Sequence, residues 1–344
     1  MRILPYFFLL TVATLVSCET NPLKQVDVSD SPVEITFERF DREVFGADFS
    51  QPAAAGQQLY RKYGDFYCDY IEYILQAAPC QPDSNFGALQ GFVTFQNMVA
   101  IYQDIQKKFP DEKIQTINAS FTDALKRYHH FFPKEILPRV VYMHSGLNFS
   151  AFSTDSIIAV GLDFYLGPED SLVQLFPFPL YFKEDMREDY LVVNSIKDFC
   201  WAYCNEKDSL RLEKDLLSSM IHHGKVMYMM DALMPEAADS TKMNWSATQY
   251  AWAENAYYNI WMALANEKVL FGTKPVDNKK WVDYGPFTNA PGIPQESPPQ
   301  LGIWIGWKMV RDYAAAHPDL SVEQLIAQSD PQAFLTAFKK PRKP

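Results

Sequence analysis

Three stretches of the chain carry the apolar pattern of β-strands. Residues 33–40 (VEITFERF) alternate apolar and charged side chains, which is the period of a half-buried strand. Residues 139–146 (RVVYMHSG) and 155–167 (DSIIAVGLDFYLG) are rich in β-branched and aromatic residues and are separated by polar, turn-like residues. We therefore predict a small sheet in which the early strand joins two later, neighbouring strands.

Most of the remaining chain has the three- and four-residue apolar spacing of helices. This spacing predicts helices over roughly 50–78, 86–108, 112–131, 186–204, 209–234, 246–269 and 301–316, followed by two short helices. The proline-rich segments 168–185 and 275–299 are predicted as loops. The fold class is α+β: one mostly helical domain over 33–338 with a small sheet, then a basic tail at 339–344. If the domain has two lobes, their boundary lies near residue 135.

The predicted helix 209–234 contains two adjacent histidines, His222 and His223, which raises the question of a metal site. An apolar stripe recurs along this helix and predicts a core-facing side; it consists of Leu212, Leu216, Met220, Met227, Met230 and Met234. His223 falls in the same stripe, whereas His222 lies about 100° round the helix. Gly224 would allow another element to approach closely, and Lys225 is expected to extend toward solvent or to meet an acid.

The residues around the two histidines do not complete a zinc peptidase motif. Such a helix needs H-E-x-x-H, in which two imidazoles at i and i+4 bind the metal and the Glu is the base. From His222 the i+1 and i+4 residues are His223 and Val226, and from His223 they are Gly224 and Met227. Both frames lack the base and the second imidazole, so a packed histidine is favoured over a metal ligand and no cofactor is expected.

Other candidate groups are isolated along the sequence. Glu254 on the next predicted helix is a weak candidate third metal ligand, although a Glu on an amphipathic helix is usually solvated or salt-bridged. Asp163 follows a predicted strand, where it could face a cleft or cap a turn. No P-loop, G-x-G-x-x-G or G-x-S-x-G motif is present.

The N-terminal segment predicts a lipid anchor. One Arg precedes an apolar run from Ile3 to Val16, which is too short for an ordinary transmembrane helix but fits a signal peptide. The run ends in Leu15-Val16-Ser17-Cys18, which resembles a bacterial lipobox; an ordinary signal peptide with an incidental Cys is the alternative. We predict a signal peptide over 1–17, acylation of Cys18, and a flexible tether over 18–32.

The net charge of −11 argues against a nucleic-acid partner, because binding to nucleic acid would require a basic surface.

The cysteines after Cys18 form two pairs along the sequence. Cys200 and Cys204, four apart in a predicted helix, are interpreted as small core residues. A bridge between Cys68 and Cys80 is left open, since they flank a predicted helix end and a proline.

Several segments, taken in order, resemble the gliding-motility lipoprotein GldB family of the Bacteroidota. They are residues 140–146, 158–167 and 221–235 and, most specifically, 297–335 with its G-x-x-x-G-W-x-x-V-R-x-Y core. The resemblance covers nearly the whole mature chain, including the lipobox and the early ITFERFDREVF. The positions that carry it include Asp163, Gly224, Lys225, Gly302, Gly306, Trp307, Arg311 and Tyr313.

This resemblance implies a lipid-anchored envelope protein of gliding motility and, through shared machinery, of type IX secretion. The family is also distantly similar to predicted zinc-dependent proteases, which implies a degenerate zincin-like fold. Only a His at 222 or 223 and Glu254 could match their metal ligands, so we expect a non-catalytic, periplasm-facing component that binds other envelope proteins. The alternatives are an active zinc peptidase with an unorthodox ligand set and a lipid-anchored binding protein for a small ligand.

Overall fold

A four-stranded sheet lies at the centre of the protein. The computed structural model describes residues 22–77, 79–80, 86–265 and 267–343. The strands are β1 (Phe37–Arg39), β2 (Arg139–Met143), β3 (Ala151–Ser153) and β4 (Ile157–Gly161), in the spatial order β1-β2-β4-β3. β1 and β4 both pair with β2 in parallel, and β3 pairs with β4 antiparallel at one edge. The predicted joining of the early strand to two neighbouring later strands is confirmed, whereas β3 was not predicted.

Both faces of the sheet are buried. In β2, Val140 and Tyr142 point into one apolar cluster, and Val141 and Met143 point into another. β4 divides its residues between the same two clusters. A strand buried on both faces reads as a continuous apolar run, which explains why β2 and β4 are easily recognised in the sequence.

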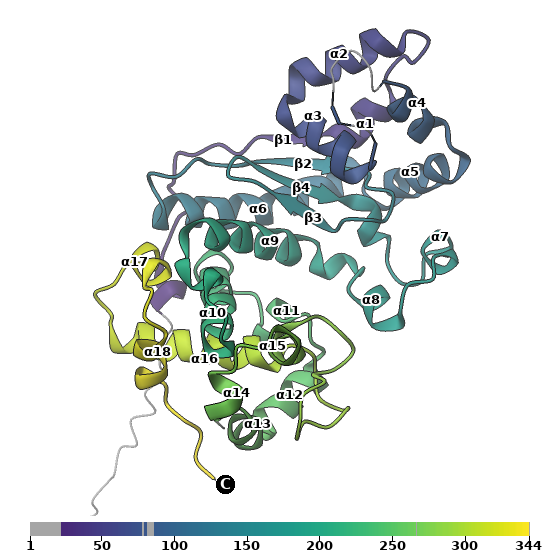
Figure 1. Cartoon of the computed structure of the whole chain (residues 1–344). Helices are drawn as coiled ribbons and strands as arrows, with labels where there is room; N and C mark the ends of the chain where they lie inside the picture. Colours follow the sequence, from purple (N-terminus) through teal and green to yellow (C-terminus); the bar gives the residue numbers. More distant parts are fainter. Residues whose placement is uncertain (1–21, 78, 81–85, 266, 344) are drawn as a thin grey trace, which may run out of the picture.

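Helices cover the sheet in two layers (Figure 1). One face carries α1 (Phe40–Phe45), α2 (Pro52–Tyr63), α3 (Asp65–Asp69), the π-helix η2 (Tyr70–Ile74) and α4 (Phe86–Thr94). The buried residues of α5 (Gln96–Lys108) belong to the cluster on the opposite face. The other face carries α6 (Asp111–Phe131) and α9 (Leu191–Lys207), whose buried residues share one cluster with the sheet. The predicted helix 50–78 is divided at Gly64, whose φ of +57° ends α2.

A further helical layer packs beneath α9. It contains α10 (Leu216–Leu233), α11 (Asp239–Lys242), α12 (Ala247–Asn255), α13 (Tyr257–Leu264), α14 (Glu267–Leu270), α15 (Pro275–Val282), α16 (Leu301–Ala316), α17 (Val322–Ala327) and α18 (Pro331–Ala337). The α+β class with mostly helical content is therefore confirmed.

Two segments predicted as loops contain helices. Residues 168–185 form α7 (Ser171–Leu175) and α8 (Leu180–Glu184), and α15 lies within 275–299. The Asp170 carboxylate accepts hydrogen bonds from the backbone N–H groups of Leu172 and Val173, which caps α7. Pro275 occupies the first turn of α15, where its missing N–H costs nothing. The prolines that predicted loops instead mark helix starts.

The predicted helix 209–234 is shorter than expected and is buried on nearly every side. Residues 209–212 form the 3-10 helix η5, and Leu212, predicted to face the core, is 67% exposed. α10 packs against α6 and α9 on one side and against α16 on the other. Because both sides of α10 are covered, its apolar stripe does not distinguish an inner from an outer face. His222, predicted to lie off the apolar stripe, is buried, and His223, predicted to lie in it, is half-buried.

The first described residues are packed against the domain. Leu23 in the short 3-10 helix η1 (Pro22–Gln25) and Val28 are both buried. The predicted flexible tether over 18–32 is therefore wrong for residues 22–28, because these two apolar side chains are buried. The predicted signal peptide and Cys18 lie outside the described residues. Among the helices of the described residues, we find none with the length and apolar content needed to cross a membrane.

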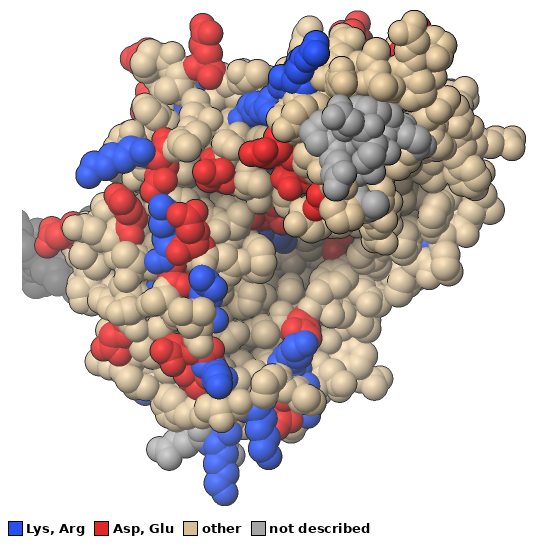
Figure 2. All heavy atoms as spheres, turned by 45° about the horizontal axis from the view of Figure 1, so that its top comes forward, with Lys and Arg blue, Asp and Glu red and all other residues tan. Residues whose placement is uncertain are grey.

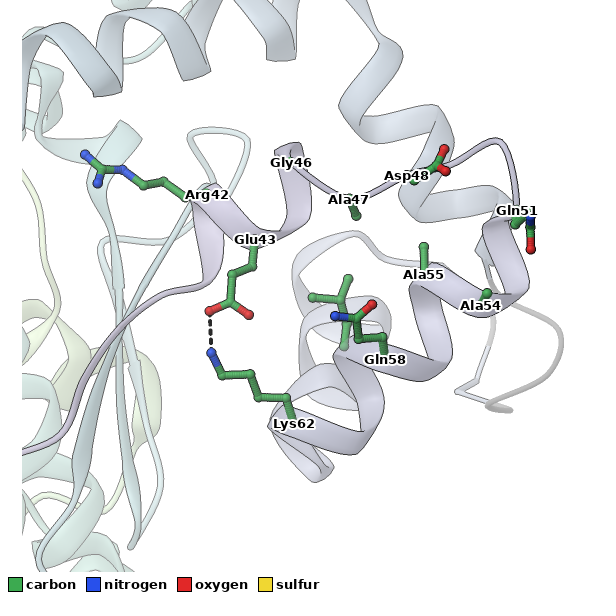
Figure 3. A pocket seen from close by; sticks show the side chains of 11 residues that line it. Arg42, Glu43, Gly46, Ala47, Asp48, Gln51, Ala54, Ala55, Gln58 and Lys62 are labelled. Atoms are coloured by element: carbon green, nitrogen blue, oxygen red, sulfur yellow. Dashed lines mark hydrogen bonds and ion pairs between the residues drawn. The ribbon is translucent and has the colours of Figure 1, made fainter.

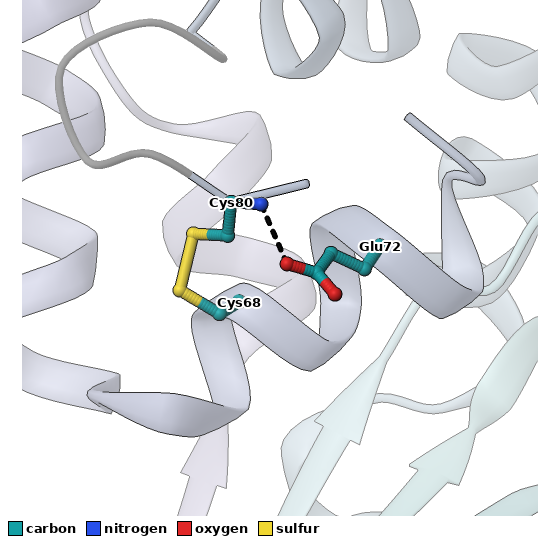
Figure 4. Close-up of a disulfide and its surroundings, with 3 residues drawn as sticks. All are labelled: Cys68, Glu72 and Cys80. Carbon is teal, nitrogen blue, oxygen red and sulfur yellow. Dashed lines mark hydrogen bonds between the residues drawn. A yellow bond between two sulfur atoms is a disulfide. The ribbon is translucent and has the colours of Figure 1, made fainter. Parts of the chain in front are cut away.

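The cysteines divide into one bridge and one buried pair. Cys68 and Cys80, left open by the sequence, form a disulfide beside the end of the helix that contains Glu72 (Figure 4). Cys200 and Cys204 on α9 are free and buried, as predicted. Burial raises the pKa of both thiols, so they are not reactive thiolates.

Candidate functional site

Glycines set a close crossing between α10 and α16. A Cβ added at Gly306 would overlap the backbone carbonyl of Met220, and one added at Gly224 would overlap the carbonyl of Gly306. Gly302, one turn earlier on α16, lies against the backbone of Trp281 in α15. The close approach expected at Gly224 is therefore present, with α16 as the approaching element.

A buried ionic network joins α10, α11 and α16 beside this crossing. The Asp231 carboxylate accepts hydrogen bonds from Trp307 Nε1 at 2.8 Å, Arg311 Nε at 2.7 Å and Lys242 Nζ at 2.8 Å. Arg311 also binds Asp239 through two nitrogens. Burial alone would lower the pKa of Arg311, but hydrogen bonds to Asp239 and Asp231 raise it. Trp307 and Arg311 thus hold the helices together.

A second buried network accounts for His222 and Lys225. Lys225 Nζ donates to Asp208 Oδ1 at 2.8 Å and to the backbone carbonyl of Ile326 at 3.0 Å. His222 lies between Asp208 Oδ2, 2.9 Å from Nδ1, and Asn205 Oδ1, 3.1 Å from Nε2. Burial would raise the pKa of Asp208, but His222 and Lys225 together lower it. Lys225 therefore pairs with an acidic side chain, which was one of the two alternatives expected for it. Both ring nitrogens of His222 are engaged, so neither is available to a metal ion.

His223 instead lines a pocket between α9 and α10, which we call the α9–α10 pocket. Its volume is about 390 Å³, within the range of small-ligand and side-chain binding sites. Most of the wall surface is apolar, although polar residues outnumber apolar ones: the lining combines Phe164, Phe182, Trp201, Val226, Met227, Met243 and Ile303 with Ser150, Asp185, Asn194, Lys197, Asp198, His223, Lys242, Asn244, Tyr284 and Gln300. Trp201 is 47% exposed, so an aromatic ring reaches the protein surface beside the pocket.

Helix α9 presents three pocket residues at a spacing known from metal sites. Lys197, Asp198 and Trp201 stand at i, i+1 and i+4, the spacing of the His, Glu and His in H-E-x-x-H. α9 also packs directly against β3 and β4. Lys197, Asp198 and Trp201 therefore line the pocket from one helix without forming a zinc-binding motif.

Burial shifts the pKa values of the ionisable groups around this pocket. It lowers the pKa of Lys197 to about 8, and together with His222 it lowers the pKa of His223 to about 4. Burial also raises the pKa values of the Asp185 and Asp198 carboxyls. Clusters of shifted groups in a pocket are typical of functional sites. At neutral pH the imidazole of His223 is uncharged.

Two hydrogen bonds join residues that line the pocket. Tyr284 donates to Asp185 Oδ2 at 2.5 Å, and Lys197 Nζ donates to Asn244 Oδ1 at 2.5 Å. Asn244 and Gln300 both have positive φ, +56° and +62°, which non-glycine residues rarely adopt. Backbone strain of this kind concentrates at functional sites. It therefore adds to the case for this pocket.

The other candidate residues from the sequence lie in structural contacts. Glu254 forms an ion pair with Lys308 at 2.9 Å. Asp163 is fully buried and accepts hydrogen bonds from the backbone of Ser145 and Leu147, so it caps the turn after β2. Tyr313 accepts a hydrogen bond from Gln328 at 3.0 Å. The structure does not bring His222, His223 and Glu254 together, and its described residues contain no group of three His, Cys, Asp or Glu side chains suited to a metal ion.

Another pocket lies between α1 and α2 and is lined mainly by polar groups (Figure 3). Four charged side chains in or beside it form ion pairs, Glu43 with Lys62 at 2.5 Å and Arg42 with Asp111 at 2.7 Å, and Asp48 accepts a hydrogen bond from the backbone of Ser50. Acidic and basic side chains are also interspersed on the face shown in Figure 2, which is hollowed near its middle. We therefore take the α9–α10 pocket, where shifted groups converge, as the candidate site.

Of the sequence candidates, only His223 lines the α9–α10 pocket, and the pocket residues on α9 were not singled out. The signal that was available is the order of elements: α9 is the first long helix after the sheet strands, and it carries a K-D-x-x-W run. The paired histidines drew attention to α10 instead. Tyr284, Asn244 and Gln300 come from loops, and no local pattern identifies them.

The comparison with known proteins gives a family. The family model described as gliding motility protein GldB matches residues 21–339, which is nearly the whole chain. No curated protein and no solved structure gives a match.

Proposed function

Since this chain belongs to the GldB family of gliding motility proteins, we propose that it is a lipid-anchored, non-catalytic component of the gliding and type IX secretion machinery. In this proposal the α9–α10 pocket binds a segment of a partner envelope protein. The acyl chains on Cys18 hold the protein to a membrane with its domain in the periplasm. The proposal includes no peptidase activity for this pocket.

The composition of the pocket carries the non-catalytic part of the proposal. A metal-dependent hydrolase needs at least three ligands to hold the ion and a base to activate water. The positions on α9 with H-E-x-x-H spacing hold a cation and an indole, Lys197 and Trp201. Neither binds zinc under ordinary conditions, because the ammonium has no lone pair and the indole N–H only donates.

The walls of the pocket support binding of a peptide segment. A mostly apolar lining with a few converging polar groups is the usual composition of a binding pocket. Phe182 and Met227 offer apolar surface inside, and the exposed ring of Trp201 offers a contact at the edge. Exposed aromatic side chains of this kind often dominate the energetics of protein interfaces.

The test is complementation of a deletion strain with pocket variants. We expect Trp201→Ala to lose spreading and to recover at least tenfold less partner in a pull-down from native membranes, with unchanged protein level. Leu212→Ala is the matched control, since Leu212 is exposed and lies outside the pocket. A deletion strain that spreads and secretes normally would refute the assignment to this machinery, and a fully active Trp201→Ala protein would refute the role of the pocket.

Metal analysis of the purified protein tests the non-catalytic part separately. We expect far less than one equivalent of zinc in the wild-type protein, unchanged in a His222→Ala/His223→Ala variant. One equivalent of zinc that disappears in this variant would show that the protein is a metalloprotein after all.

A further inference from the structure

The first described residues are fixed to the body of the domain. Leu23 is 8% exposed and Val28 is 6% exposed, and Leu23 belongs to the same apolar cluster as α6 and α10. Arg127 Nη1 on α6 donates a hydrogen bond to the Leu23 carbonyl at 3.3 Å. Lys24 pairs with Glu236, just after α10, at 3.5 Å. The chain is therefore held in place from η1 onward.

The distance between this fixed point and the proposed lipid anchor is short. Four residue steps separate Cys18 from Pro22, and a fully extended chain covers about 14 Å in four steps. A domain of about 320 residues has a radius of gyration of about 20 Å, which corresponds to a sphere of about 25 Å radius. Because the connection is shorter than this radius, the domain cannot turn its far side to the membrane.

We infer that the surface around Pro22–Gln25 lies against the lipid headgroups and that the protein has one fixed orientation on its membrane. This inference rests on the lipid anchor at Cys18 proposed above. The exposed side chains at this surface include one of each sign, Lys24 and Glu236, whose exposures are 49% and 77%. The two charges of this pair cancel, so the inferred orientation rests on chain geometry.

In this orientation the α9–α10 pocket remains accessible to a partner protein. Figure 1 shows the first described residues on the left of the molecule and α7 and α8 on the right. Leu175 on α7 and Leu180 on α8 are 78% and 75% exposed. Phe182 on α8 and Asp185 just after it line the α9–α10 pocket. A partner can therefore reach the pocket from the side that the membrane does not cover.

Depth-dependent fluorescence quenching tests the orientation. The full-length lipidated protein is reconstituted in phosphatidylcholine–phosphatidylglycerol vesicles that contain a headgroup nitroxide lipid. A fluorophore is attached to Glu236→Cys or, as the distal site, to Leu175→Cys. The native cysteines in the described residues do not compete, because they are bridged or buried. We expect at least threefold stronger quenching at position 236 than at position 175.

A variant with a long linker provides the control for the tether. Insertion of twenty Gly/Ser residues between positions 21 and 22 adds an average span of about 25 Å and should remove the difference. Equal quenching at the two positions with the native tether would overturn the fixed orientation. Failure of the wild-type protein to bind vesicles, or binding that Cys18→Ser does not reduce, would instead overturn the anchor.

Discussion

Individual residues around the α9–α10 pocket have pKa values shifted from those they have in water. His223 stays neutral well below the usual pKa of histidine because burial and His222 disfavour its charge. His222, one residue away, is fully engaged with Asp208 and Asn205. The adjacent histidines therefore have different environments, which their shared helix does not reveal.

The lowered pKa of His223 predicts a dependence of stability on pH. In the unfolded chain the imidazole takes up a proton near the ordinary histidine pKa of 6.5, whereas in the folded protein it does so only near 4. The free energy of unfolding therefore falls as pH drops from 6.5 to about 4, by roughly 3 kcal/mol at most from this residue. Urea unfolding of the wild-type protein and of His223→Gln at pH 7 and pH 4.5 measures the difference.

We expect His223→Gln to lose less stability than the wild-type protein over this range. His130→Gln serves as control, because His130 is the second of the histidine pair at the end of α6 and lies outside the pocket. Identical pH profiles for the wild-type protein and His223→Gln would show that the imidazole takes up its proton freely in the folded state.

The pair of helices α10 and α16 shows how small residues determine the packing of elements. Gly306 and Gly224 bring the two backbones so close that any side chain at Gly306 meets the Met220 carbonyl. We expect Gly306→Ala to lower the free energy of unfolding by about 1–3 kcal/mol or more, because neither backbone can move away within a packed core.

The matched variant for this test is Gly91→Ala on α4. An added Cβ at Gly91 meets nothing within 4 Å, so the higher helix propensity of Ala should raise stability by about 0.5–1 kcal/mol. Chemical unfolding of both variants provides the comparison. Equal effects at positions 306 and 91 would refute the close crossing.

The disulfide in the first helical layer supports a further prediction. Cys68 and Cys80 are 12 residues apart, and closing a loop of this length in the unfolded chain corresponds to about 3 kcal/mol. A Cys68→Ser/Cys80→Ser protein should unfold at lower denaturant concentration. Its midpoint should be insensitive to a reducing agent, whereas the wild-type midpoint should fall to the variant's value. A wild-type midpoint that reductant leaves unchanged would contradict the bridge.

The sequence predicted elements well where one local signal was sufficient. β2 and β4 are apolar on both faces, and α16 coincides with its predicted range 301–316. The prediction from the sequence failed where tertiary contacts determine the position of a helix or a side chain. α10 is covered on both sides, so periodicity could not orient His222 and His223, and the helix starts at Ser171 and Pro275 were hidden among prolines. The α9–α10 pocket needs residues from loops more than 100 positions apart, such as Ser150 and Gln300.

Helix α10 belongs to two of the three apolar clusters in the described residues, and the strands β2 and β4 connect the third cluster to one of these. Val226, Met229 and Met230 of α10 lie in the cluster that includes the sheet, and Leu216, Met220 and Met227 lie in the cluster around α16. Neither cluster can lose α10 and remain packed. We therefore expect the domain to unfold in one cooperative transition.

The distribution of tryptophan makes this prediction easy to check. All seven Trp residues lie at position 201 or later, so their fluorescence reports on α9 and the layers after it. Far-ultraviolet circular dichroism reports on all helices, including those before the sheet. The two signals should give coincident urea transitions, and separate midpoints would mean that the first helical layer unfolds on its own.

The parallel pairing of β1 with β2 has a consequence for the order of folding. Phe37 pairs with Val140, and about a hundred residues lie between these partners. A chain that emerges from a translocation pore with its N-terminus first exposes β1 long before β2 is available. The sheet therefore forms only after α1–α6 have emerged, and contacts this distant in sequence close slowly. Until then the first strand is an unpaired edge, so holding chaperones should have their greatest effect on this protein before residue 143 has emerged.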